Sequence, residues 1–193
     1  MTVFHQALSR IALLCVATLA LTVGSAQAQQ DNNDGPFFGK HAKGKWIIGV
    51  KAAKVDNNIE DLKDADAVGL VLGYEFDRPI GRSGGSSTVE LEYIDGDSTN
   101  FEGVGTYDPD ILNLFFSYRS AGDLYYKFKV GVSYSDVEIT TPGLTTGNED
   151  VALAGGIGLG YRVGDYGTVE LEYSLDSGEN DLGVLGLNAL LEF

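Results

Sequence analysis

The chain of 193 residues has the length of a single folded domain. Its hydrophobic residues (44%), charged residues (21%) and 26 glycines exclude both a disordered polyanion and a helical membrane protein. Lys and Arg number 13 against 28 Asp and Glu, and the net charge of -15 repels phosphate backbones, so we expect no nucleic-acid partner.

Residues 1–28 have the pattern of a cleaved signal peptide. Arg10 precedes an apolar run over residues 11–23, which is followed by an A-x-A motif at residues 26–28. The run is shorter than the roughly 20 residues that a spanning helix needs. We therefore predict export across the inner membrane. The segment contains Cys15, the single cysteine, so the mature chain would fold without disulfides.

Residues 29–44 show no periodicity and are predicted to form a flexible periplasmic lead. From Lys45 to Phe193, apolar residues recur at every second position, which is the period of a β-strand. The four prolines lie outside the alternating runs. The predicted strands, eight in all, cover approximately residues 45–55, 66–77, 87–95, 110–119, 123–135, 151–163, 168–176 and 185–193.

The two faces of these strands differ in composition. One carries valine, leucine and aromatic residues, and the other carries glycine, alanine, serine and charged residues. Alternation alone leaves open which face is inside, because a soluble lipocalin-like barrel points its apolar face inward and a membrane barrel points it outward. The charged residues of the second face are Lys51, Glu75, Glu90, Glu92, Arg119, Lys127, Lys129, Arg162, Glu170 and Glu172.

Four features favour the membrane arrangement: aromatic residues at strand ends, small residues on the charged face, alternation of tight and long connections, and the terminal Phe193. We predict an all-β, eight-stranded antiparallel up-and-down transmembrane β-barrel. Its first and last strands must pair, because a sheet edge cannot stay open in hydrocarbon. The predicted aromatic girdles comprise Trp46, Tyr74, Phe76, Tyr118, Tyr126, Tyr161 and Phe193 at one rim and Tyr93, Tyr134 and Tyr173 at the other.

With apolar residues outside, the charged face would fill a narrow lumen and form a plug of paired charges. Within it, the tight turn after the sixth strand predicts a pair between Arg162 and Glu170. A proton or ion path along the same charges is the functional alternative.

The signal peptide, the alternating strands, the aromatic rims and the terminal LGVLGLNALLEF are similar to the small outer-membrane β-barrel proteins of Gram-negative bacteria, of the OmpA-transmembrane-domain and OmpX type. The similarity spans about residues 45–193. It implies contact with outer-membrane lipid and lipopolysaccharide. It also implies that Phe193, with Leu191 and Ala189, is the signal recognised by the barrel-assembly machinery, although Asn188 stands where that signal often has glycine.

We expect no catalysis and no cofactor. The predicted barrel contains no histidine, since His41 lies in the lead, and the Glu90/Glu92 and Glu170/Glu172 spacings mark one wall of the lumen. An Asp95-Gly96-Asp97 start resembles a calcium loop, but Asn100 replaces its required glycine.

Function is expected in the long acidic connections, in envelope integrity or surface interaction, with divalent cations or basic partner surfaces as possible ligands. The alternatives are a channel for small solutes or ions and a soluble periplasmic ligand-binding barrel. The acidic residues are Asp56, Glu60, Asp61, Asp64 and Asp66 in or beside the first long connection, and Asp95, Asp97, Glu102, Asp108 and Asp110 in or beside the second.

Overall fold

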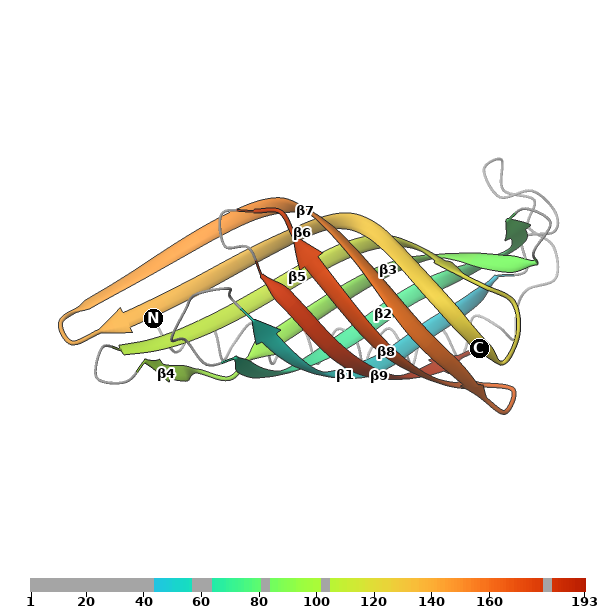
Figure 1. Cartoon of the computed structure of the whole chain (residues 1–193), viewed down its shortest axis with the longest axis horizontal. Helices are drawn as coiled ribbons and strands as arrows, with labels where there is room; N and C mark the ends of the chain where they lie inside the picture. The colour runs from blue at the N-terminus through green and yellow to red at the C-terminus, as the bar shows by residue number, and fades with distance from the viewer. Residues whose placement is uncertain (1–43, 57–63, 81–83, 102–104, 179–181) are drawn as a thin grey trace, which may run out of the picture. The chain divides into compact units, whose positions relative to one another are not determined.

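Alternating apolar and polar side chains form a closed antiparallel β-barrel in the computed structural model (Figure 1). The structure describes residues 44–56, 64–80, 84–101, 105–178 and 182–193. The predicted signal peptide and almost all of the predicted lead lie outside these residues. The strands are β1 (Lys45–Asp56), β2 (Ala65–Ile80), β3 (Gly85–Gly96), β4 (Thr99–Phe101), β5 (Gly105–Arg119), β6 (Leu124–Thr141), β7 (Leu144–Val163), β8 (Gly167–Asp176) and β9 (Gly183–Glu192).

The ring contains every strand except β4, which gives the eight barrel strands that the sequence predicts. Neighbours in the chain pair in up-and-down order, β3 pairs with β5, and the three-residue β4 adds to β5 at one end. The ring closes where β1 pairs with β9, from Ile47 opposite Glu192 to Asp56 opposite Gly183. This pairing confirms the predicted contact between the first and last barrel strands. Among the described residues, no helix is long and apolar enough to cross a membrane.

The apolar face lies outside. Outward side chains such as Val130 (63% exposed) and Leu171 (52%) are open, whereas the inward Lys127 is 1% exposed. A soluble barrel of the lipocalin kind has the opposite arrangement, with its apolar face around an interior site. The observed exterior therefore excludes the soluble ligand-binding barrel and suits a lipid environment.

The expected long loop over residues 136–150 is instead a β-hairpin. β6 and β7 stay in register to the pair Thr141 and Leu144, and the chain reverses at Gly143, whose φ of 97° suits glycine. The hairpin extends well beyond the other strand ends (Figure 1). Sequence analysis missed it because the alternation continues there with acidic residues in place of outward apolar ones.

Two prolines lie within strands, contrary to the sequence prediction. Pro79 lies in β2, where the register with β3 shifts between Phe76 and Ile80. Pro109 lies in β5, at the gap between the β3 ladder, which ends at Asp110, and the β4 ladder, which begins at Tyr107. Both positions interrupt pairing on one side of the strand, so the missing N–H group costs little there.

The lumen also contains apolar side chains that the sequence analysis did not single out. A cluster fills the end of the barrel at which the longer connections lie, and a smaller one of Ile47, Val71 and Leu190 lies elsewhere on the inner wall. We call the larger one the apolar cluster; it consists of Ala53, Val55, Ala65, Ala67, Ile94, Tyr107, Ile111, Val137, Leu182 and Val184.

The neighbours Ile111 and Leu112 test this inside-out packing, because they face opposite sides of β5. Ile111 is 2% exposed and Leu112 is 42% exposed. Ile111→Ala should lower the free energy of unfolding by about 2–5 kcal/mol because it leaves a cavity in the lumen. In lipid vesicles, Leu112→Ala should cost much less, since acyl chains fill the space. Urea unfolding, followed by the fluorescence of Trp46, the single tryptophan, measures both; equal losses would contradict the packing.

Candidate functional site

Charged side chains from strands on all sides of the barrel meet inside the lumen. Four cations and four anions, each at most 5% exposed, contact one another there, and a further carboxylate, Glu192 (4% exposed), lies 3.5 Å from Lys45 Nζ at the end of the barrel. Burial of an unpaired charge is expensive, so this balance is required for folding. We call the group the lumen network; it consists of Lys51, Arg119, Lys127 and Lys129 with Glu90, Glu92, Glu170 and Glu172.

Lys127 lies at the centre of the lumen network. Its Nζ atom is 2.6 Å from Glu90 Oε2 and 2.9 Å from Glu170 Oε2, and it also donates to Glu172 Oε1. An ammonium group has three N–H donors, so these carboxylates satisfy all of them.

Lys51 and Lys129 approach a second pair of carboxylates from opposite walls. Lys51 Nζ lies 2.6 Å from Glu92 Oε2 and 3.2 Å from Glu172 Oε2. Lys129 Nζ lies 2.9 Å from Glu92 Oε1 and 3.0 Å from Glu172 Oε2. Lys129 Nζ also lies 4.3 Å from the centre of the Phe115 ring, a cation–π distance. These ion pairs link β1, β3, β6 and β8 across the lumen, although the four strands are far apart in the sequence.

Arg119 occupies the end of the lumen network nearest the tight turns. Its guanidinium nitrogens lie 2.9 Å from Glu170 and 3.2 Å from Glu90. Glu75 and Glu192 lie farther out, at 3.5 and 3.9 Å. Glu75 was predicted as a member and takes this peripheral place, whereas Glu192 was not singled out.

The predicted pair between Arg162 and Glu170 is wrong. Arg162 stands opposite Thr168 in the β7–β8 ladder, and Glu170 stands opposite Gly160. Arg162 donates to the carbonyl oxygen of Gly122 in the neighbouring turn instead. Every second residue faces inward, and Arg162 and Glu170 are offset from each other by one inward position. The length of the turn alone does not determine this register.

Tyr125 lies between Arg162 and Glu170, and the sequence analysis did not predict it as a lumen residue. It is 2% exposed, and its Oη donates to Glu170 Oε1 at 2.5 Å. The guanidinium carbons of Arg162 and Arg119 lie 4.7 and 5.9 Å from the centre of its ring. Its odd number gives it the same face as Lys127, so the strand alternation was the signal that could have found it.

Glycines on the inner wall leave the space that these long side chains need. A β-carbon at Gly160 would lie 2.2 Å from Tyr125 Cζ, so the ring lies directly on the glycine backbone. A β-carbon at Gly158 would lie 3.1 Å from Glu172 Cγ. The glycine column of β7 is therefore complementary to the large side chains of β6 and β8.

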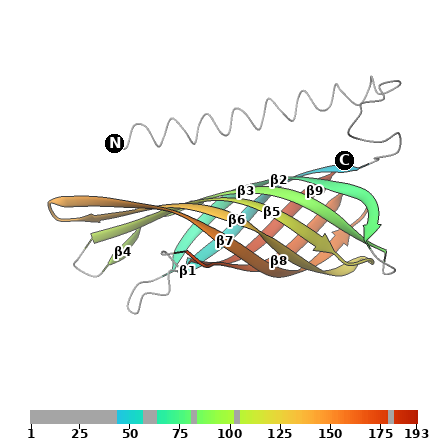
Figure 2. The same ribbon diagram turned by 90° about the horizontal axis from the view of Figure 1, so that it is seen from above.

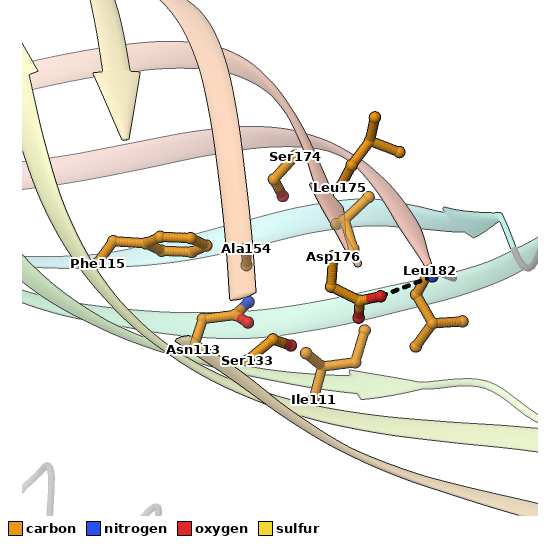
Figure 3. Close-up of a pocket in the computed structure, with 10 residues that line it drawn as sticks. Ile111, Asn113, Phe115, Ser133, Ala154, Ser174, Leu175, Asp176 and Leu182 are labelled. Atoms are coloured by element: carbon orange, nitrogen blue, oxygen red, sulfur yellow. Dashed lines mark hydrogen bonds between the residues drawn. The ribbon is translucent and has the colours of Figure 1, made fainter. Parts of the chain in front are cut away.

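A small cavity lies between the lumen network and the apolar cluster (Figure 3). Its volume is about 10 Å³, roughly the space of one water molecule. Asn113, Ser133 and Ser174 give it a polar lining, and Phe115 borders it on the network side. Asp176 accepts a hydrogen bond from the backbone N–H of Leu182 at 3.0 Å. This cavity gives no room for a hydrated ion.

Three lumen carboxylates, Glu90, Glu92 and Glu172, lie close enough to one another to hold a metal ion, within 4.8 Å. Lysine ammonium groups occupy the space between them, at the distances given above. The pairs Glu90/Glu92 and Glu170/Glu172, which could serve acid–base chemistry, also accept hydrogen bonds from lysine ammonium groups. Their arrangement is that of a structural charge network.

The predicted girdle residues lie at strand ends on the outer face. At one rim, Trp46, Tyr74 and Phe76 form a chain of rings with centres 5.2 Å apart. The same rim contains a contact between Tyr118 and Tyr126 at 6.3 Å, and Phe128, which was not predicted, lies 5.5 Å from Tyr126. Tyr126 and Tyr161 of this rim are 48% and 55% exposed, and Tyr93, Tyr134 and Tyr173 lie toward the other rim.

The predicted assembly signal lies in β9 at the closure of the ring. Phe193 N donates to Trp46 O at 3.0 Å, and Trp46 N donates to Phe193 O at 2.8 Å. Ala189 and Leu191 lie opposite Val50 and Ile48 of β1. The last residues of the chain therefore complete the seam that closes the barrel.

Carboxylates form a row on the outer face just beyond the second rim. Asp95, Asp110, Asp136 and Glu149 stand opposite one another in turn across β3, β5, β6 and β7. Among the other predicted acidic residues, Asp66 pairs with Lys54 at 2.9 Å, and Asp108 accepts from Ser98 Oγ at 3.0 Å. Glu60, Asp61 and Glu102 lie outside the described residues, and the cation site remains a prediction.

Glu172→Gln tests the lumen network. The amide is isosteric but carries no charge, so three lysines would lose their shared anion in a buried site. We expect the free energy of unfolding to fall by about 3–5 kcal/mol. Glu149→Gln, on the exposed outer face, should change it little. Urea unfolding in vesicles provides the measurement, and similar midpoints for both variants would disprove the structural role.

Gly160→Ala tests the contact between Tyr125 and the glycine column. The added methyl group should displace the ring and cost about 1–3 kcal/mol of stability. Gly155→Ala is the control, because a β-carbon there lies 3.7 Å from its nearest neighbour, Lys129 O. In a double-mutant cycle, Tyr125→Ala should remove the cost of Gly160→Ala. Strictly additive effects would rule the contact out.

Comparison with known proteins agrees with this architecture. The sequence matches the model of a family described as outer membrane protein beta-barrel domain, over residues 16–188. A search of curated proteins finds no significant match. Similar solved structures include Ail, the attachment invasion locus protein of Yersinia pestis, with a TM-score of 0.60, 13% identity and coverage of 79% of this chain and 99% of that chain.

Two barrels of Pseudomonas aeruginosa are also similar. The N-terminal β-barrel domain of OprF has a TM-score of 0.58 and 14% identity, with 76% of this chain and 97% of that chain covered. OprG has a TM-score of 0.54 and 13% identity, with 79% and 97% covered. At these identities the likeness shows the fold alone. The family model, however, covers most of the sequence, and the chain therefore belongs to the outer membrane protein beta-barrel domain family.

Proposed function

We propose that this protein is a non-conducting barrel that anchors a surface-exposed β-hairpin and acidic connections in the outer membrane, in the service of envelope integrity or surface interaction. The observation that carries the proposal is the balanced lumen network, whose members are all buried and paired. An ion crossing the lumen would have to displace several of these pairs at once in a region of low dielectric constant.

The apolar cluster supports the same conclusion. Side chains such as Val55, Tyr107 and Ile111 fill the lumen beyond the lumen network, at the end of the longer connections. They offer no hydrogen-bonding partner to replace the hydration shell of an ion. In the channel alternative, both the lumen network and the apolar cluster would have to move aside. No contact among the described residues favours that alternative.

The direction of insertion follows from the family and from the strand ends. Both ends of the barrel sequence, at β1 and β9, lie at the side of the tight turns (Figure 1). In outer-membrane barrels, short turns face the periplasm and longer connections face the exterior. We infer that the signal peptide is removed after export, that Ala189, Leu191 and Phe193 serve the assembly machinery, and that the β6–β7 hairpin faces the cell exterior.

Surface interaction is the activity that this arrangement supports best. The attachment invasion locus protein is, by its name, concerned with attachment. The comparison adds to the proposal only through the shared fold. In this chain the part available to a partner is the end of the hairpin, residues 136–150, which contains no member of the lumen network.

Recording in planar lipid bilayers tests the proposal. The purified full-length protein should show no steady conductance. Insertion in the same sample is verified by heat-modifiable gel mobility, so that silence cannot be attributed to a failed reconstitution, and a known porin serves as the positive control. Regular discrete openings of the wild-type protein would overturn the non-conducting barrel and support the channel alternative.

A further inference from the structure

One edge of the β6–β7 hairpin has no neighbouring strand. β7 pairs with β6 from Leu144 to Tyr161, but it pairs with β8 only from Ala154 onward. Within the described residues, no strand lies beside residues 144–153 on that side. Figures 1 and 2 show this part of β7 at the outer edge of the protruding sheet. A row of backbone donors and acceptors is therefore available over residues 144–149.

The backbone groups that face the open side can be assigned from one hydrogen bond. Ser177 N donates to Leu153 O at 2.9 Å on the side of β8. In an antiparallel strand, alternate residues direct both their N–H and C=O groups to the same side. The open edge accordingly presents the backbone groups of Thr145, Gly147 and Glu149.

The edge lacks the usual protection against strand addition. Natural edge strands are commonly blocked by lysine, by proline, by a bulge or by a covering element. Residues 144–153 contain neither lysine nor proline, and β7 stays in register with β6 along them. Thr145, Gly147 and Glu149 are exposed. An unprotected edge of this length suits β-augmentation, in which an extended segment of another chain adds one strand.

The charge of the hairpin determines which segment would fit. Asp136 and Glu149 are opposite each other on the outer face, and Asp110 continues the same row. The sequence contains no Lys or Arg between residues 130 and 161. Two copies paired through this edge would both carry the acidic row and would offer no basic side chain to offset it, which is unfavourable. A strand with lysine or arginine at alternate positions would place its charges beside the row.

We propose that the β7 edge, residues 144–149, binds an extended basic segment of a partner polypeptide by β-strand addition. The inference rests on the proposed function, in that it names the class of partner for the surface hairpin. Backbone hydrogen bonds to Thr145, Gly147 and Glu149 provide the affinity. The carboxylate row provides the preference for basic side chains and a dependence on salt.

Binding of a synthetic peptide to the full-length protein in detergent micelles tests the proposal. The probe alternates lysine and threonine over about six residues, the usual length of a strand. A peptide of the same length that alternates glutamate and threonine is the charge control. We expect the basic peptide to bind at low salt and the acidic peptide to bind at least about tenfold more weakly.

Gly147→Pro separates strand addition from simple charge attraction. Proline removes an N–H group on the open side and leaves the carboxylates in place. The site has room, because a β-carbon at Gly147 meets only Asp136 Oδ1, at 3.9 Å. We expect binding to weaken by roughly tenfold, while Thr146→Ala, the adjacent control, binds like the wild type. Heat-modifiable mobility confirms that both variants fold.

Three results would overturn the inference: no binding of the basic peptide, equal binding to wild type and Gly147→Pro, or association of the protein with itself that the peptide does not displace. Equal binding would indicate charge attraction without a strand. The conductance of the same preparation is recorded separately, so that a silent barrel that fails to bind the peptide refutes the partner class and leaves the non-conducting barrel intact.

Discussion

The requirement that every backbone polar group inside a hydrocarbon layer finds a partner determines the rest of this structure. Strands that cross such a layer must form a closed ring, and the ring here is completed by β1 and β9. Closure with eight strands produces an interior only wide enough for side chains. The outer face must then be apolar, and the polar residues of each strand have no other place than the narrow lumen.

That lumen solves a packing problem and an electrostatic problem with the same residues. Long charged side chains fill the volume, and each member of the lumen network lies within ion-pair distance of a counterion. The glycines opposite them, such as Gly158 and Gly160, supply the space that a side chain of ordinary size would take. A buried ion pair contributes little net stability compared with apolar packing, but breaking one is costly. The lumen network therefore acts mainly against alternative registers, since a shift of one residue would move every charge to the outer face.

Strand alternation predicted the barrel, its closure and the eight charged members of the lumen network, because a period of two is preserved wherever the two faces meet different media. It could not predict partners across the lumen. The ladder register decides that Glu170 faces Gly160, so that Arg162 contacts Tyr125 instead. Tyr125 was overlooked because an aromatic residue beside the outward Tyr126 looks like part of the apolar face, although its number assigns it to the lumen.

The β6–β7 hairpin keeps the same alternation, but its outer face meets water instead of lipid. Between Tyr134 and Asp136 the outward residues change from aromatic to acidic, while inward residues such as Val137 remain apolar and buried. The period survives because the inner face still packs on the apolar cluster, and only the outer medium changes from lipid to water. Beyond that cluster neither face is covered, and the exposed strand is held by the β6 ladder alone. An edge strand of this kind has a neighbouring strand on one side only, although β6 pairs in turn with β5 as far as Thr140. It gains stability from each additional strand, which makes the open edge of β7 the part of the molecule that has most to gain from a partner.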